Sequence, residues 1–178
     1  MKNLKLSILL FSSLVISSCS VSTTPKEETN AEGKKEIVHN TSKIRNGISF
    51  EKNTLKVTQA FLMLEDGTLL SDENTVSIGQ KVNMRLLIED GFKLVDGKVR
   101  LGAEEKIETD NGDKVLDEAD LFKAYDTDGV DPKDAEYITL MAEITKLDKL
   151  YDYFLISFRV WDKQSDAEVK GSYKLYIK

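Results

Sequence analysis

The stretch that decides the fold is residues 154–161, which read Phe-Leu-Ile-Ser-Phe-Arg-Val-Trp. Apolar residues recur there at every second position, namely Phe154, Ile156, Phe158 and Val160. Successive side chains of a β-strand point to opposite faces, so a period of two indicates a strand with one face in the core. We therefore predict a half-buried β-strand.

The same alternation recurs elsewhere in the chain. Its predicted core positions are Val82, Met84, Leu86 and Ile88; Val99, Leu101 and Ala103; Ile138, Leu140, Ala142 and Ile144; and Val169, Tyr173, Leu175 and Ile177. Residues 55–63 are predicted to place Leu55, Val57, Phe61 and Met63 on one face, opposite Lys56, Thr58, Ala60 and Leu62. The β-branched and aromatic residues in these stretches suit a pleated, half-buried surface.

Turn signals separate the alternating stretches. They are Glu65-Asp66-Gly67, Asp90-Gly91, Asp96-Gly97 and the Asp-Asn-Gly-Asp sequence of residues 110–113. Roughly seven strands of about ten residues each predict an all-β fold, an antiparallel two-sheet sandwich that is immunoglobulin-like in architecture.

One region departs from the period of two. Leu121 and Tyr125 are spaced to share one face of a helix, and Asp131-Pro132 is typical of a helix start. We predict one or two short helical segments around residues 117–136, in a connection between strands.

The charge of the chain is unevenly distributed. The chain has 31 acidic and 25 basic residues, and residues 104–136 alone contain 13 acidic and 4 basic ones. An acidic surface repels nucleic acid, so we expect no nucleic-acid partner. Carboxylates on a glycine-containing loop can converge on calcium, which makes Asp126, Asp128, Asp131 and Asp134 a candidate calcium site. The alternative is that these residues cap helices and line a solvated loop; we expect no other cofactor.

Aromatic residues form a second candidate site. Strand parity places Tyr153, Arg159 and Trp161 on the outward side of residues 153–161, and Tyr176 is predicted to share that side. Exposed aromatic rings beside a guanidinium can stack on a sugar ring or on a partner's side chain. The alternative is that neighbouring segments of the chain cover these rings.

The N-terminus has the composition of a secretory signal. A basic start, Met1–Lys5, precedes an apolar run to Ile16, and the segment closes with Ile16-Ser17-Ser18-Cys19. This ending resembles the lipobox of bacterial lipoproteins. The resemblance implies a signal peptide over residues 1–18 and lipidation of Cys19, for example by palmitate. It also implies a membrane-anchored protein of the bacterial cell envelope, at the outer membrane or cell surface if the cell is Gram-negative. The alternative is an ordinary cleaved signal with an incidental cysteine.

Composition also predicts the domain organisation. Residues 20–46 are rich in Ser, Thr, Lys, Glu and Asn and contain no aromatic residue, so they bury too little apolar surface to fold. We predict a lipidated tether over residues 19–46 and one β-sandwich domain over residues 47–178.

Function is constrained mainly by what the predicted domain lacks. Cys19 and His39 are the sole cysteine and histidine, and both precede residue 47. Ser-His and Cys-His catalysis therefore cannot be built within it, and we predict a binding module rather than an enzyme. We expect a monomer that binds an envelope protein or a glycan. One alternative is a carbohydrate-binding accessory module at the cell surface, and a less favoured one is a small envelope hydrolase using two carboxylates.

Overall fold

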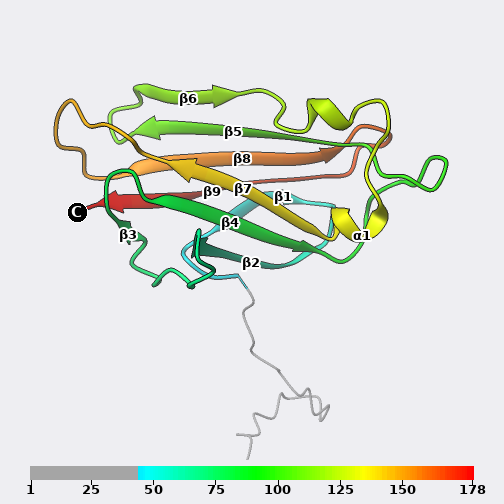
Figure 1. The fold of residues 1–178 in the computed structure, drawn as a ribbon, viewed down its shortest axis with the longest axis horizontal. Helices are drawn as coiled ribbons and strands as arrows, with labels where there is room; N and C mark the ends of the chain where they lie inside the picture. Colours follow the sequence, from blue (N-terminus) through cyan, green and yellow to red (C-terminus); the bar gives the residue numbers. More distant parts are fainter. Residues whose placement is uncertain (1–43) are drawn as a thin grey trace, which may run out of the picture. The chain divides into compact units, whose positions relative to one another are not determined.

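The computed structural model describes residues 44–178. The predicted signal peptide, Cys19 and most of the predicted tether lie outside the described residues. Two β-sheets pack face to face, and nearly all strand pairs are antiparallel, which confirms the predicted sandwich (Figure 1).

The larger sheet has the strand order β1-β9-β8-β5-β6. Its members are β1 (Ser49–Asn53), β9 (Glu168–Ile177), β8 (Phe154–Asp162), β5 (Leu101–Thr109) and β6 (Lys114–Glu118). A two-residue strand, β3 (Thr75–Val76), adds a parallel pairing to the end of β9. The predicted strand at residues 154–161 thus lies in the middle of the sheet, between β9 and β5.

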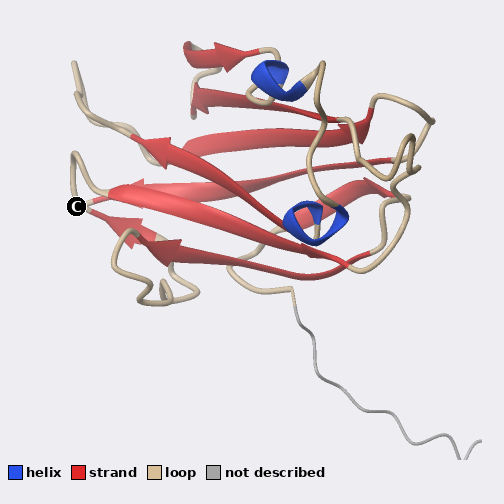
Figure 2. Ribbon diagram, turned by 45° about the vertical axis from the view of Figure 1, so that its right-hand side comes forward, coloured by secondary structure: helices blue, strands red, loops and turns tan. Residues whose placement is uncertain are grey.

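The smaller sheet has the order β2-β4-β7. It consists of β2 (Val57–Leu64), β4 (Lys81–Ile88) and β7 (Tyr137–Glu143). Figure 2 shows the strands of the two layers and the two short helices at one side of them.

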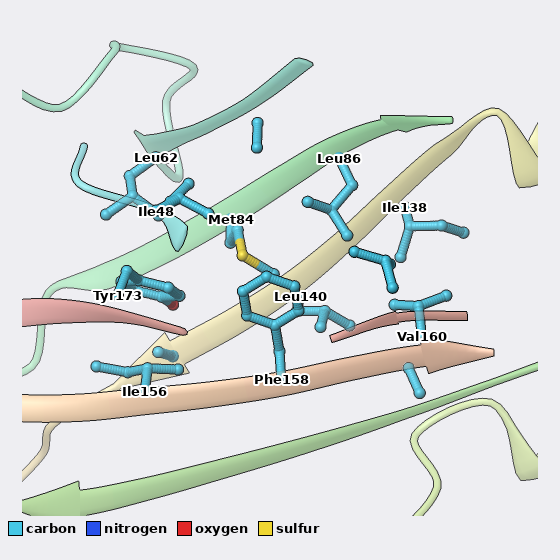
Figure 3. Packing of buried hydrophobic residues seen from close by; sticks show 14 of the residues in the cluster. Ile48, Leu62, Met84, Leu86, Ile138, Leu140, Ile156, Phe158, Val160 and Tyr173 are labelled. Carbon is cyan, nitrogen blue, oxygen red and sulfur yellow. The ribbon is translucent and has the colours of Figure 1, made fainter. Parts of the chain in front are cut away.

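The core lies between the two sheets. Figure 3 shows Leu62, Met84 and Leu140 of the smaller sheet facing Ile156, Phe158 and Tyr173 of the larger one. The burial pattern confirms the alternation predicted for β4, β7, β8 and β9, because every second residue is buried through most of each strand. Fully burying a large apolar side chain stabilises a fold by about 1.5–3 kcal/mol, so this layer supplies the main driving force for folding.

The face predicted for residues 55–63 is wrong beyond Val57. The pairing of β2 with β4 shifts register between Val57 and Gln59, which is the signature of a β-bulge. One extra residue reverses the facing of everything after it. Consequently Ala60 and Leu62 are buried with Leu55 and Val57, while Phe61 and Met63 point outward and are only half-buried.

The two short helical segments predicted around residues 117–136 are present. A 3₁₀ turn, η1 (Lys123–Tyr125), and one α-helical turn, α1 (Pro132–Ala135), lie within residues 117–136. Asp117 belongs instead to β6, because residues 116–118 pair with β5. None of the helices in residues 44–178 is long and apolar enough to cross a membrane.

Two buried asparagines connect the two sheets. Asn46 and Asn74 have positive φ angles of 58° and 53°, a conformation that Asn adopts more readily than most residues. The Asn46 Nδ2 donates to Asn74 Oδ1 at 3.0 Å, and the Asn74 Nδ2 donates back to the Asn46 carbonyl at 2.8 Å. Asn46 Oδ1 accepts the amide of Leu62 in β2, and Asn74 Nδ2 also donates to the Lys174 carbonyl in β9. We call this arrangement the asparagine clip.

The clip predicts that Asn46→Asp destabilises the domain. The new oxygen would face the carbonyls of Leu70 and Ser71 and Oδ1 of Asn74, all of which are acceptors. We expect a loss of about 2–4 kcal/mol at pH 8, measured by urea unfolding, because a buried charge is left among acceptors. The loss should shrink at pH 4, where a protonated carboxyl can donate. Asn111→Asp, in the exposed turn between β5 and β6, is the matched control. An equal effect of both substitutions would contradict the role of the clip.

Candidate functional site

The indole of Trp161 is already in contact with its own chain. The ring covers Gly102, where an added Cβ would fall 2.3 Å from Cζ2 of the indole. The guanidinium of Arg159 lies over the indole, 4.9 Å from the ring centroid, and is held there by an ion pair with Glu168. Trp161 and Arg159 therefore lie together as predicted, but as an internal cation–π pair rather than a free stacking platform.

Tyr153 and Tyr176 lie together near the other end of β8. Their ring centroids are 6.5 Å apart in an edge-to-face arrangement, and the ammonium of Lys174 lies 3.6 Å from the centre of the Tyr153 ring. A shallow pocket of about 260 Å³ borders Tyr176 and is also lined by Ser172, Lys174 and Asn46. Here too, a lysine of the domain itself, Lys174, already lies over the ring of Tyr153, which was predicted to stack on a ligand.

The four aspartates of the candidate calcium site diverge. Asp126 forms an ion pair with Lys163, and Asp131 forms one with Lys98 at 2.6 Å. Within residues 44–178, no group of three or more His, Cys, Asp or Glu side chains is arranged to hold a metal ion. Asp128 and Asp134 are exposed. The geometry thus gives the calcium prediction no support.

Sequence reasoning missed the outer face of the smaller sheet. Its cross-strand rows are Gln59–Leu87–Tyr137, Phe61–Arg85–Thr139 and Met63–Asn83–Met141. Tyr137 and Met141 are 54% and 47% exposed, and the other apolar members are half-buried. We call the five apolar side chains of these rows the outer-face patch: Phe61, Met63, Leu87, Tyr137 and Met141.

A pocket of about 400 Å³ opens at one end of this patch. Leu87 and Tyr137 line it together with Thr58 and two glutamates, Glu89 and Glu136. Neither glutamate forms an ion pair with any cationic side chain in the described part of the chain. The pocket combines an aromatic ring, an aliphatic surface and two carboxylates without partners, a combination suited to a ligand that carries an aliphatic stem and a positive charge.

The outer-face patch was only partly readable in the sequence. Parity did place Tyr137 and Met141 on the outer side of their strand. The β-bulge hid Phe61 and Met63, because it reverses their facing without changing the local pattern of apolar residues. Leu87 is one of three consecutive apolar residues, Leu86-Leu87-Ile88. This departure from alternation was the available sign that an apolar side chain lies on the outer face of the strand.

One buried carboxyl has an unusual electrostatic environment. Glu105 of β5 points into the core and is 1% exposed, and its Oε1 has no hydrogen-bond partner. Burial raises the pKa of Glu105 to about 7. The hydroxyl of Tyr173 is also buried without a partner; burial, with a smaller contribution from the charge of Glu105, raises the pKa of Tyr173 well above its ordinary value.

Glu105 predicts a loss of stability as the pH rises. Its pKa is about 7 in the folded state and 4.5 in its ordinary environment, so between these values the folded state retains a proton that the unfolded state releases. The free energy of unfolding should therefore fall by about 3 kcal/mol from pH 4.5 to pH 8 on account of this group. Glu105→Gln should abolish that part of the fall in urea titrations at several pH values. Glu108→Gln, on the outward face of the same strand, should retain the fall; the same pH profile in both variants would contradict the prediction.

Comparisons with known proteins give a limited result. No family model matches the chain, and no curated protein matches it. Among solved structures, the crystal structure of the C-terminal domain of wzt is similar over 84% of this chain and 89% of that one. The sequence identity is 11% and the TM-score is 0.44, a likeness that carries no information on function.

Proposed function

We propose that the protein is a lipid-anchored binding module of the bacterial cell envelope, and that its sandwich binds a protein partner through the outer-face patch. The observation that carries the proposal is the presence of five large apolar side chains on the outer face of one sheet, of which Tyr137 and Met141 are about half exposed and the other three are half-buried. Several apolar side chains gathered on one face mark interaction sites on protein domains, whereas single exposed apolar residues do not.

The shape and composition of the patch favour a protein partner. Tyrosine and methionine are enriched at the centres of protein interfaces, while charged residues are depleted there. Arg85 stands in the middle row, and its Nε donates to the Thr139 hydroxyl at 3.2 Å, which fixes the guanidinium against the sheet. Arginine held in this way is a frequent anchor at protein interfaces.

A glycan is the second candidate ligand. The half-exposed ring of Tyr137 borders a pocket whose glutamates can accept hydrogen bonds from sugar hydroxyls. A glycan held in this pocket would depend on Tyr137 and would be insensitive to Phe61, which is not among the residues that line the pocket. A protein partner covering the whole patch would depend on both residues.

The anchor part of the proposal rests on the Ile16-Ser17-Ser18-Cys19 ending of the N-terminal segment. One acyl chain gives only marginal membrane binding, and two or more hold a protein stably, because each buried methylene contributes about 0.8 kcal/mol. Cys19→Ala should therefore yield a precursor that is not processed and takes up no labelled fatty acid. Ser18→Ala, which keeps a small residue before the cysteine, is the control. Equal labelling of the Cys19→Ala variant and the parent would refute lipidation at this position.

The binding surface can be tested in intact cells by photocrosslinking. A photoreactive phenylalanine analogue at position 61 or 141 should give a discrete adduct with an envelope protein, because both positions lie in the patch. The same analogue at Ser157, on the outer face of the larger sheet, should give none. In binding measurements with the identified partner, Phe61→Ala and Met141→Ala should each weaken affinity by about 10-fold or more. Adducts of equal yield at all three positions, or none at any, would count against the proposed surface.

A further inference from the structure

Most sheet edges in residues 44–178 are protected against pairing with another strand. Residues 44–46 run beside β2, where Ile44 bridges to Ala60 and the Arg45 amide donates to the Ala60 carbonyl at 2.8 Å. The edges formed by β1 and β6 are five residues long, and the pairing of each with its neighbour contains a register shift. Short, irregular and charged edges are the usual means by which proteins prevent strand addition.

The free edge of β7 has none of these protections. The strand is seven residues long, its pairing with β4 is regular, and it contains no proline, no lysine and one charged residue, Glu143. Figure 1 shows β7 on the side of β4 that lies away from β2, and within the described residues β4 is its one strand partner.

The ladder shows which main-chain groups this edge presents. The Ile88 amide donates to the Glu136 carbonyl at 2.9 Å, and the Gly79 amide donates to the Ile144 carbonyl at 2.8 Å. Hydrogen-bonded and non-hydrogen-bonded pairs alternate in an antiparallel ladder, so the even-numbered residues of β7 bond to β4. The N–H and C=O groups of Tyr137, Thr139, Met141 and Glu143 therefore point away from β4. No main-chain group in residues 44–178 hydrogen-bonds to them from that side.

We propose that β7 is the docking edge for an extended, basic segment of a partner protein, which adds to the smaller sheet as a fourth strand. The inference rests on the proposed function and specifies how the partner binds. Main-chain hydrogen bonds to alternate residues of β7 supply the pairing. Side chains on the outer side of the added strand lie beside Tyr137 and Met141, which extends the outer-face patch across the new strand.

Charge complementarity identifies the partner segment as basic. The chain from Gly47 onward has 27 acidic and 18 basic residues, a net charge of −9. Glu136 precedes β7 directly, and Glu89 lines the same pocket. A lysine or arginine near the end of the added strand can lay its aliphatic stem along Leu87 and Tyr137 and bring its charge to these two carboxylates. A second copy of the domain, residues 47–178, would bring another net charge of −9, which disfavours self-association.

A proline substitution tests the pairing directly. Thr139→Pro removes an N–H that points away from β4 and leaves the amides of residues 138 and 140 in the ladder. Thr139→Val is the matched control, because it keeps the N–H and, like the proline variant, loses the hydroxyl that binds Arg85. Met141→Lys is a second variant that places a positive charge beside the edge at a half-exposed position, with Met141→Gln as its control.

The probe is a set of random 12-residue peptides displayed on phage and selected against the full-length chain carrying Cys19→Ser. Selected peptides should be enriched in lysine and arginine relative to the unselected set. They should also slow amide hydrogen exchange at Thr139 and Met141. Their dissociation constants should rise at least 10-fold in Thr139→Pro and change less than 3-fold in Thr139→Val. They should rise further in Met141→Lys than in Met141→Gln, because both substitutions remove the methionine and only one adds a positive charge. Glu89→Gln combined with Glu136→Gln should weaken binding and reduce its dependence on salt.

Several outcomes overturn the proposal. If selected peptides bind Thr139→Pro and Met141→Lys as tightly as the parent but lose affinity in Phe61→Ala, edge pairing is refuted and the outer-face patch stands as the binding surface. If no peptide is enriched, docking of an extended segment is refuted, and photocrosslinking at positions 61 and 141 decides the proposed function separately. If the chain sediments as a dimer that Thr139→Pro dissociates, the occupant is a second copy of this chain.

Discussion

The hydrogen-bonded pair of Asn46 and Asn74 is the constraint on which the rest of the domain depends. Hydrophobic packing brings two sheets together but does not specify their register, whereas a buried polar group must meet particular partners. Asn46 satisfies an amide in β2 and carbonyls of residues 70 and 71, and Asn74 bonds to main-chain groups of β9. The pair thus fixes the β2 edge of the smaller sheet against β9 of the larger one. It also places the start of the described chain along β2, which covers that edge and leaves β7 as the open one.

Much of the fold could be predicted because its long strands are simple. In the stretches from Phe154 to Val160, Ile138 to Ile144 and Val82 to Ile88, every second residue is apolar and buried, so the inward residues could be named from periodicity. The turn at residues 110–113 was equally clear from its Asp-Asn-Gly-Asp sequence. In the structure Gly112 has a φ of 82°, a conformation that favours glycine. The short strands β1, β3 and β6 were missed, since two to five residues give too little pattern. Residues 117 and 118 were included in the predicted helical region, and only their pairing with β5 shows that they belong to a strand.

The candidate site was less accessible from the sequence, for a related reason. Composition identified aromatic residues near arginine and lysine, but it does not show whether a cation of the same domain already lies over the ring. Arg159 does so over Trp161, and Lys174 does so over Tyr153. The outer-face patch depends on one inserted residue near Val57, which turns Phe61 and Met63 to the surface. A bulge is a property of strand pairing, so no periodicity within residues 55–63 alone reveals it.

The position of Ile44 beside β2 has a mechanical consequence. β7 and residue 44 lie at opposite edges of the same three-stranded sheet. If a partner pulls on β7 while the chain is held through residue 44, the load crosses the sheet at right angles to its strands. It passes through the β7–β4 and β4–β2 ladders in series and then through the hydrogen bonds of Asn46. A load in this direction opens a ladder one bond at a time instead of shearing all of its bonds together. The sandwich would then yield in steps under tension, and the force it withstands would be set by its weakest single row.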